Sequence, residues 1–388
     1  MYTIQTLNRI SDCIREVLPE ERYHIDEAAQ APDAVLVRSA DMHGMEAPQS
    51  LLAVARAGAG YNNIPVDEYT KRGVCVFNTP GANANAVAEL VLLGLLLSGR
   101  KVVDGIEWAR ALKGRESVPG LVEKGKGQFA GPELRGKTLG VIGLGAIGIL
   151  VANAAAQGLG MTVLGEDPFI SVQHAWSLSR AVQRVDSVEE ILARSDFVTV
   201  HVPLSEKTRG MIDSAALARM KPGARLLNFS RAELVDGEAV RAALQAGKLA
   251  AYITDFPTDD MLGAPGVVCI PHLGASTPES EENCACMAAE ELRAYLETGS
   301  IHNSVNLPEM QLGRPEGARL QVIHANAPGM VSRISAIISG EGINIENMTN
   351  KGRGDWAVTV LETDQPLPES AMEALRALPQ AVRVRAVL

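Results

Sequence analysis

The glycine-rich sequence at residues 143–148, Gly-Leu-Gly-Ala-Ile-Gly, lies near the middle of the chain. It follows an apolar run at 138–142 and precedes an alanine-rich stretch of helical character at 149–159. Three glycines at this spacing between a strand and a helix are typical of dinucleotide-binding units. The first glycine allows a tight turn, the second lets a pyrophosphate approach the backbone, and the third lets the helix pack on the strand. The pyrophosphate would then meet the free N–H groups of the helix N-terminus.

An acidic residue follows the next predicted strand, at 161–164. Asp167 comes 19 residues after Gly148, where a carboxylate binds a ribose 2′-hydroxyl and would repel a 2′-phosphate. We therefore predict NAD, rather than NADP, as the cofactor. The motif assigns cofactor binding to Gly143, Gly145, Ala146, Ile147, Gly148 and Asp167.

The length and charge of the chain limit its architecture and its partners. A chain of 388 residues is too long for one hydrophobic core, so two or three domains are expected. The net charge of −10 gives no general attraction for nucleic acid or for an anionic membrane, and we expect neither as a partner. An anionic substrate would need a local cluster of arginines.

The cysteines and the apolar segments indicate a cytoplasmic protein. The five cysteines are scattered, odd in number and without metal-ligand spacing, so we predict reduced thiols and no metal site. The N-terminus lacks the apolar core of a signal peptide. The longest apolar run, at 86–98, contains Glu89 and is too short to cross a bilayer, so it is predicted to be a buried helix.

Strands alternate with helices over most of the chain, which predicts an α/β protein with two doubly wound parallel-sheet domains. We expect the first domain to be discontinuous, at 1–100 and 282–310, with a helix at 279–296 returning to it and a dinucleotide-binding domain at 101–281 inserted. The segment 115–131 is rich in glycine and lysine and is predicted to be a loop. The expected strands are 34–37, 51–55, 74–77, 138–142, 161–164, 197–200, 224–229, 251–254 and 267–270.

A linker at 299–317 precedes a third domain, predicted at 318–388. Its order is strand, helix, strand, strand, helix, strand, which predicts an antiparallel sheet with both helices on one face. The expected elements are 319–324, 330–339, 343–349, 356–362, 368–377 and 382–387.

Two residues at predicted strand ends are candidates for chemistry, because open α/β sheets bind ligands there. Arg231 follows the strand at 224–229, and its planar guanidinium could clamp a carboxylate. His272 follows the strand at 267–270 and is suited to acid–base chemistry near neutral pH. His201, which also ends a strand, is the reserve candidate.

These features resemble the D-isomer-specific 2-hydroxyacid dehydrogenases over residues from about 34 to 310. The resemblance rests on the glycine fingerprint, Asp167, the sequence Asn-Phe-Ser-Arg at 228–231 and the sequence Pro-His-Leu-Gly-Ala-Ser-Thr at 271–277. It implies that Arg231 orients the substrate and that His272 transfers the C2 hydroxyl proton. It further implies that the cofactor is contacted by His201, Val202, Pro203, Phe229, Ser230, Arg231, Asp255, His272, Gly274 and Ala275.

The chain departs from the family pattern at the acid that would hold His272. The family reads Asp-Val-Phe followed by Glu-Pro, whereas this chain reads Thr-Asp-Phe-Pro-Thr-Asp-Asp at 254–260. Alignment on Phe256 gives Asp259 as the catalytic acid, and Asp260 is the alternative. Asp255 would then fall near the nicotinamide amide.

Local sequences resemble those family members that oxidise 3-phospho-D-glycerate to 3-phosphooxypyruvate, the entry to L-serine biosynthesis. These sequences lie at 36–39, 55–60, 78–81 and 303–306. They imply that substrate binding involves Arg38, Ser39, Arg56, Gly58, Ala59, Gly60 and Asn78. The alternatives are another D-2-hydroxyacid dehydrogenase, such as a glyoxylate or hydroxypyruvate reductase, and an NAD-sensing protein like the corepressors built on this fold.

The C-terminal domain resembles an ACT regulatory domain through Asn-Ala-Pro-Gly at 326–329 and Gly-Ile-Asn-Ile at 342–345. The resemblance implies that L-serine binds His324, Asn326 and Asn344 between two tails joined edge to edge, in a homodimer or homotetramer. A purely oligomeric contact is the alternative role.

Overall fold

The computed structural model describes residues 1–315 and 317–387, so Glu316 of the expected linker and Leu388 of the expected third domain lie outside the described part. The chain forms two compact units. Unit 1 comprises Met1–Ala82 and Pro278–Leu388, and unit 2 comprises Asn83–Thr277. Unit 1 thus holds both the first and the third expected domain, and residues 83–100 are counted with unit 2.

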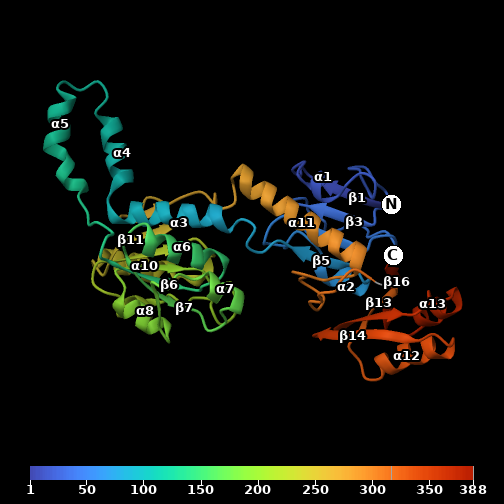
Figure 1. The fold of residues 1–388 in the computed structure, drawn as a ribbon. Coiled ribbons are helices and arrows are strands. Elements are labelled where there is room, and N and C mark those ends of the chain that lie inside the picture. Colours follow the sequence, from blue (N-terminus) through green and yellow to red (C-terminus); the bar gives the residue numbers. More distant parts are fainter. Residues whose placement is uncertain (316, 388) are drawn as a thin grey trace. The chain divides into compact units, whose positions relative to one another are not determined.

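Unit 1 contains sheet A, a five-stranded parallel sheet in the order β2-β1-β3-β4-β5, which is the flavodoxin-like order. Helix α11 (Pro278–Thr298) lies along this sheet (Figure 1). Its side chains Leu292 and Tyr295 are buried in the core that the helix shares with the sheet. Helix α1 (Ile14–Val17) packs beside it, and α2 (Val66–Lys71) precedes β5. The strands are β1 (Tyr2–Leu7), β2 (Tyr23–Ile25), β3 (Ala34–Val37), β4 (Ala53–Arg56) and β5 (Cys75–Asn78).

Unit 2 contains sheet B, a seven-stranded parallel sheet in the order β12-β11-β10-β9-β6-β7-β8. Counted from β6, this is the Rossmann order with one further strand, and the strand order reverses between β6 and β9. Its strands are β6 (Thr138–Ile142), β7 (Thr162–Glu166), β8 (Val182–Arg184), β9 (Phe197–Val200), β10 (Ala224–Asn228), β11 (Leu249–Thr254) and β12 (Val267–Cys269).

Helices cover sheet B. Helix α6 (Ala146–Gln157) begins inside the glycine fingerprint, and α3 (Ala84–Gly99) packs beside it. A side chain on Gly94 of α3 would come within 2.7 Å of the Phe229 ring, so α3 lies directly on this sheet. The predicted buried helix is buried on one side only, because Leu93 and Leu96 are exposed. The remaining helices are α7 (Val172–Ser177), α8 (Val188–Arg194), α9 (Ser214–Arg219), η2 (Ala232–Leu234) and α10 (Gly237–Gln245).

The loop predicted at 115–131 is wrong: this segment contains α5 (Val118–Gly125) and the short 3-10 helix η1 (Lys126–Phe129). Pro119 stands in the first turn of α5, where proline is tolerated, and the glycines allow close packing. A side chain on Gly125 would overlap the Trp108 ring of α4 (Val102–Ala111). Figure 1 shows α4 and α5 as a two-helix arm that projects from sheet B.

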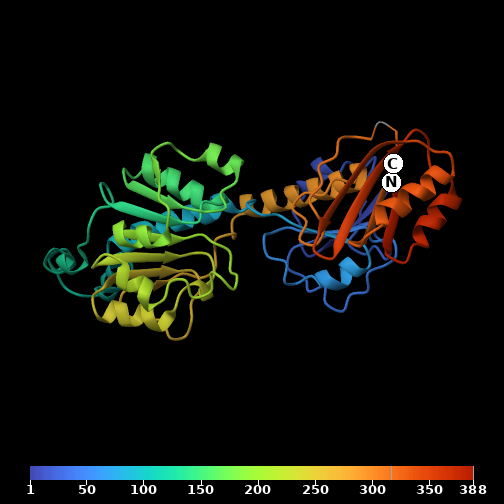
Figure 2. The ribbon, with the colours of Figure 1, turned by 90° about the horizontal axis from the view of Figure 1, so that it is seen from below.

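The third sheet is antiparallel, in the order β14-β15-β13-β16, and α12 and α13 lie on one of its faces (Figure 2). This confirms the predicted βαββαβ arrangement. The opposite face of the sheet contributes Ile323, Val358 and Val360 to the core that contains Tyr295. The elements are β13 (Ala318–Ala325), α12 (Met330–Gly340), β14 (Ile345–Arg353), β15 (Trp356–Thr363), α13 (Glu369–Arg376) and β16 (Ala381–Val387).

Together the two parallel sheets and the antiparallel sheet confirm the predicted fold class. Within the described part of the chain, no helix is both long and apolar enough to span a membrane. Those residues also include no group of three or more histidine, cysteine or acidic side chains arranged to hold a metal ion.

Candidate active site

The glycine fingerprint forms a cradle that fits a dinucleotide. Gly143 has a φ of +92°, and a Cβ there would lie 2.6 Å from the carbonyl oxygen of His201. A Cβ on Gly148 would lie 2.0 Å from the Gly143 carbonyl oxygen, so the helix needs glycine to approach the strand. A Cβ on Gly145 would have no neighbouring atom within 4 Å, which leaves room for a pyrophosphate at the N-terminus of α6.

Asp167 follows β7 and turns back toward this cradle. Its Oδ2 accepts a hydrogen bond of 2.9 Å from the backbone N–H of Leu144, and its Oδ1 accepts one of 2.8 Å from Phe169. These bonds fix the carboxylate beside the fingerprint, where a ribose hydroxyl is expected. The motif residues that the sequence assigned to the cofactor are thus brought together.

His201 follows β9, which is next to β6 where the strand order reverses. Its Nε2 bonds the hydroxyl of Thr199 at 2.9 Å, and its buried Nδ1 has no partner among the described residues. Burial lowers the pKa of His201 to about 4, so the ring is neutral at pH 7. A ring with so low a pKa is a weak base for the hydroxyl proton at neutral pH, which argues against the reserve candidate. A Cβ on Gly143 would also lie 3.0 Å from Val202 Cγ1, and Pro203 follows Val202 in the chain.

Arg231, Asp255 and His272 follow the carboxyl ends of three adjacent strands. Strand register places Asn228 beside Thr254, and Thr254 beside Cys269. The side-chain amide of Asn228 donates to the Arg231 carbonyl oxygen at 2.8 Å, and Ser230 Oγ donates to the Val200 carbonyl oxygen at 2.8 Å. These bonds shape the turn that presents the exposed Arg231 side chain.

His272 is exposed, and its ring packs on Phe256 with 4.7 Å between ring centroids. Phe256 follows β11 directly after Asp255, so the neighbouring strand supports the imidazole. After His272 the chain turns at Gly274, where a side chain would press on Val87. Ala275 follows and is partly buried.

The three acids that follow β11, Asp255, Asp259 and Asp260, have different surroundings. Asp255 is only 1 % exposed, and its Oδ1 has no hydrogen-bond partner among the described residues. Burial raises the pKa of Asp255, while the charges of His272 and Arg231 act in the opposite direction. Asp259 is exposed. Asp260 is held by Arg241 at 2.8 Å and by Thr258 at 2.7 Å, in a cavity that is also lined by Phe256 and Met261.

The expected substrate residues converge at the carboxyl edge of sheet A. Strand register places Val37, Arg56 and Asn78 side by side on β3, β4 and β5. The Arg56 guanidinium lies against Gly58, which has a φ of +144°; a Cβ there would lie 2.0 Å from Nη1. Burial lowers the pKa of Arg56, and the neighbouring charge of Arg38 acts in the same direction. The Ala59 carbonyl oxygen accepts a hydrogen bond of 2.6 Å from Asn78 Nδ2, and Gly60 is the next residue in the chain.

Several neighbours of this patch were not among the residues predicted from the sequence. Glu281, at the start of α11, forms an ion pair of 2.7 Å with Arg38. Asn8, after β1, has a φ of +68°, and its side-chain oxygen accepts a bond of 3.1 Å from the backbone N–H of Ser39. Thr79 Oγ1 accepts one of 2.7 Å from Gly58 N. Of these three residues, only Asn8 lies at a strand end beside the point where the strand order reverses. Its position in the sequence is therefore the one signal that could have indicated a place in the substrate site.

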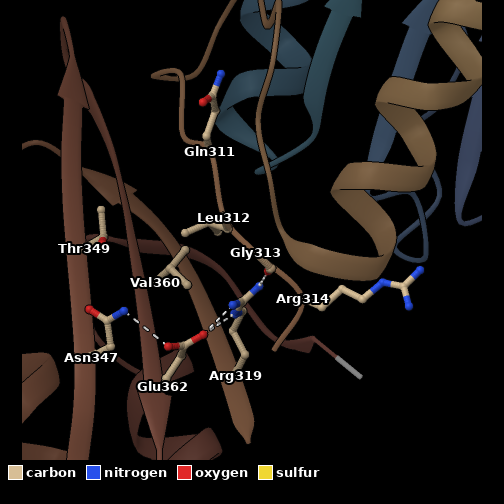
Figure 3. A pocket seen from close by; sticks show the side chains of 9 residues that line it. All are labelled: Gln311, Leu312, Gly313, Arg314, Arg319, Asn347, Thr349, Val360 and Glu362. Atoms are coloured by element: carbon tan, nitrogen blue, oxygen red, sulfur yellow. Dashed lines mark hydrogen bonds and ion pairs between the residues drawn. The ribbon is translucent and has the colours of Figure 1, made fainter. Parts of the chain in front are cut away.

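A second cavity, of about 430 Å³, lies on the face of the antiparallel sheet opposite α12 and α13 (Figure 3). Its buried Arg319 pairs with Glu362, whose other oxygen accepts a 3.2 Å bond from Asn347. Arg319 Nη1 also donates to the carbonyl oxygens of Thr298 and Gly313, each at 2.7 Å. Because these groups bond one another, we interpret them as a clamp that ties the sheet to α11 and the linker.

The three expected effector residues do not meet within one chain. His324 is 2 % exposed, and its two ring nitrogens bond the Ala325 carbonyl oxygen and the Thr359 hydroxyl. Asn326 bonds the Gly354 carbonyl oxygen at one end of the β14–β15 hairpin. Asn344 precedes β14 and bonds Asp364 through its backbone, at the other end of the same pair of strands.

Comparisons with known proteins agree with this architecture. Residues 95–274 match the family model for the D-isomer specific 2-hydroxyacid dehydrogenase NAD binding domain, and residues 318–380 match the ACT domain. A D-3-phosphoglycerate dehydrogenase of Escherichia coli K12 is 34 % identical over 355 residues, which span 88 % of this chain and 82 % of that protein.

Solved structures give the same picture. The apo D-mandelate dehydrogenase of Rhodotorula graminis aligns with a TM-score of 0.67 at 25 % identity, over 81 % of this chain and 99 % of that one. The NAD⁺-bound 3-phosphoglycerate dehydrogenase of Entamoeba histolytica aligns with a TM-score of 0.60 at 25 % identity, over 79 % and 98 % of the two chains. This chain therefore belongs to the D-isomer-specific 2-hydroxyacid dehydrogenase family and carries a C-terminal ACT domain.

Proposed function

We propose that this chain oxidises 3-phospho-D-glycerate to 3-phosphooxypyruvate with NAD, the first step of L-serine biosynthesis. The observation that carries the proposal is the row of Val37, Arg56 and Asn78 at the carboxyl edge of sheet A, with Arg38 and Ser39 directly after it. The substrate carries about three negative charges near neutral pH, from a carboxylate and a nearly dianionic phosphate. In a chain of net charge −10, such a local pair of arginines is what an anion of this kind requires.

Binding of the anion would exchange one partner of Arg38. Its guanidinium is paired with Glu281, and both side chains are partly exposed, so the pair can open at small cost. Arg56 needs no such exchange, because its Nε donates to the Arg38 carbonyl oxygen and leaves the rest of its fork available. We therefore assign one anionic end of the substrate to Arg56 and a second contact to Arg38, whose ion pair with Glu281 has to open.

The proton and the substrate carboxylate are handled by residues of unit 2. In this proposal the His272 imidazole accepts the proton of the C2 hydroxyl during oxidation, and the Phe256 ring holds that imidazole in place. The Arg231 guanidinium orients the carboxylate and polarises the adjoining C–O bond. NAD, when bound, supplies the hydride acceptor.

The cofactor would be held by the cradle of Gly143, Gly145 and Gly148 and by the carboxylate of Asp167. Both oxygens of Asp167 accept backbone bonds yet keep lone pairs for ribose hydroxyl groups. The same negative charge disfavours a 2′-phosphate. Asp255, buried and short of one partner, is assigned to the nicotinamide end of the same site.

Substrate choice tests the proposal against its alternatives. The assay follows NADH formation by the full chain with 3-phospho-D-glycerate, D-glycerate, D-lactate and D-2-hydroxyglutarate. We expect the highest kcat/KM with 3-phospho-D-glycerate. A preference for an unphosphorylated acid would instead support a hydroxypyruvate or glyoxylate reductase, and NAD binding without turnover of any acid would support a sensor protein.

The ACT domain is proposed to bind L-serine at His324, Asn326 and Asn344. The strand register separates Asn344 from Asn326 along one sheet, which fits a site completed by a second copy of the chain. Serine would then favour a less active arrangement of the chain, so that serine binding and inhibition are linked.

We also propose a homodimer or homotetramer in the cytoplasm. Within α4 and α5, both fully described, no residue is buried, and Ile106 and Val102 expose large apolar side chains. Leu93 and Leu96 of α3 are exposed too. Exposed apolar groups on a projecting arm are suited to contact a second copy. The five unpaired cysteines are consistent with a reducing compartment.

A further inference from the structure

A cleft of about 630 Å³ in unit 1 has only arginines as its charged lining. It lies where β16 meets the segment before β4 and the turn between α2 and β5, and its arginines are Arg72, Arg376 and Arg383. Ala47, Pro48 and Gln49 contribute backbone and small side chains. Among the residues that the structure describes, none of those lining this cleft is acidic.

The cleft is at the opposite edge of sheet A from the substrate residues. Arg72 precedes β5 and Gln49 precedes β4, whereas Arg56 and Asn78 end these same parallel strands. The arginine cleft is therefore separate from the proposed substrate-binding residues of sheet A.

Backbone contacts hold two of the three arginines, Arg72 and Arg383, in place without neutralising them. Arg383 Nη2 donates to the Arg72 carbonyl oxygen at 3.0 Å, and Nη1 donates to the Gln49 carbonyl oxygen at 3.3 Å. Arg72 Nη1 donates to the Ala47 carbonyl oxygen at 2.9 Å. A Cβ on Gly73, which has a φ of +69°, would lie 2.6 Å from Arg383 Cβ, so β16 sits tightly on this turn.

The positive charge of the cleft is poorly compensated. Within the described part of the chain, neither Arg72 nor Arg383 forms an ion pair, and Arg376 pairs only with Glu369 of its own helix, which is well exposed. Burial lowers the pKa of Arg383, and the charge of Arg385 acts in the same direction. Arginine nevertheless stays protonated near neutral pH, so the three like charges repel one another.

We propose that this cleft binds a small phosphate-bearing anion. Planar guanidinium groups match phosphate oxygens in pairs, and three of them line this cleft. Each terminal guanidinium nitrogen carries two N–H groups, so those that bond a carbonyl or carboxylate oxygen can still donate to an anion. The volume lies in the range of small-molecule sites, and the acidic chain as a whole disfavours nucleic acid. Since β16 belongs to the ACT sheet and the turn belongs to sheet A, an anion held here also fastens the two sheets together.

Calorimetric titration of the full chain with inorganic pyrophosphate, at constant low ionic strength, tests the proposal. We expect saturable binding and a raised Tm in the natural chain and in Arg38→Gln, which lacks one proposed substrate arginine. The double variant Arg72→Gln/Arg376→Gln should lose about tenfold or more in affinity. Arg333→Gln/Arg184→Gln carries the same charge change outside the cleft and should bind normally.

The kcat/KM for 3-phospho-D-glycerate should change less than about twofold in both double variants, which separates this test from that of the proposed function. Equal pyrophosphate affinity in the natural chain and in the cleft variant would overturn the proposal, because the binding would lie elsewhere. Pyrophosphate that binds the natural chain no more tightly than chloride does would overturn the proposal as well. Tighter binding of citrate than of pyrophosphate would overturn the assignment to phosphate.

Discussion

The backbone N–H of Leu144 donates a hydrogen bond of 2.9 Å to Asp167 Oδ2, which joins the glycine fingerprint to the end of the next strand. This bond sets the carboxylate where the adenosine ribose is expected and gives a physical basis for cofactor choice. We therefore predict that Asp167, whose carboxylate orders the cradle through this bond, also selects the cofactor.

Asp167→Ala should relax the preference for NAD over NADP, because the repulsive charge is removed. We expect kcat/KM with NADP to rise relative to that with NAD by about tenfold or more. The check is the ratio of the two values with 3-phospho-D-glycerate. Glu238→Ala, a loss of charge on α10, should leave the ratio unchanged. Equal use of both cofactors by the natural chain would contradict the role of Asp167.

His272→Ala should lower kcat by about 10² to 10⁴-fold, the usual contribution of a general acid–base group, with little change in NAD affinity.

Separate Asp→Asn variants at positions 255, 259 and 260 then identify the acid that tunes the imidazole. Removing that acid should shift the His272 limb of the pH–rate profile to lower pH, because the imidazolium loses a stabilising charge.

The sequence alignment favours Asp259, whereas burial beside the charges of His272 and Arg231 favours Asp255. Asp260 is engaged with Arg241, so Asp260→Asn should leave the limb in place. A shift in Asp260→Asn alone would contradict both assignments, and no shift in any of the three variants would mean that His272 works without a carboxylate.

The buried Glu291 should make stability fall with rising pH. Burial raises its pKa to about 8, from an ordinary value of 4.5, while a 2.7 Å bond from Asn303 acts in the opposite direction. Between about pH 4.5 and 8 the unfolded chain releases this proton and the folded chain keeps it, so the free energy of unfolding decreases across that window.

Glu291→Gln keeps an acceptor for Asn303 but has no proton to lose. We expect it to remove a loss of about 4 kcal/mol between pH 5 and pH 9, measured by denaturant unfolding at each pH. The exposed Glu282→Gln, on the same helix, is the control and should behave as the natural chain. Parallel pH profiles for the natural chain and Glu291→Gln would show that Glu291 is already ionised at neutral pH.

Ile106→Glu should weaken self-association, because a charge would enter the apolar surface of the α4–α5 arm. Sedimentation over a range of concentrations should reveal a smaller species. Leu262→Glu makes the same change at another exposed apolar residue and should leave the mass unchanged. An unaltered assembly in Ile106→Glu would place the subunit contact elsewhere.

L-serine should inhibit the intact chain and raise its Tm if the ACT domain is a receptor. Asn344→Ala and Asn326→Ala should each raise the half-inhibitory serine concentration by about tenfold, the effect of losing a charge-assisted hydrogen bond or two. Asn347→Ala changes the same type of side chain on β14, outside the predicted set, and should remain sensitive. Absence of any serine effect would leave the tail a structural module, consistent with its share in the core around Tyr295.

Much of this architecture is determined by the sequence alone. The strands at 34–37, 138–142 and 197–200 and the βαββαβ order of the ACT domain follow from local apolar patterns that repeat with the period of each element. The glycine spacing predicts the cradle, because the turn depends only on adjacent φ angles and on the absence of Cβ atoms. Strand ends likewise locate Arg231 and His272 without knowledge of the packing.

Contacts between distant parts of the chain were decided only by the tertiary structure. The pairing of Arg38 with Glu281 joins segments more than two hundred residues apart, and no local pattern encodes it. The same is true of the separation of Asn344 from Asn326, the burial of Asp255 and the three arginines brought together by β16. Local periodicity fixes which face of an element is apolar, but the partner of a polar side chain depends on how whole sheets and helices pack, and that is a property of the assembled fold.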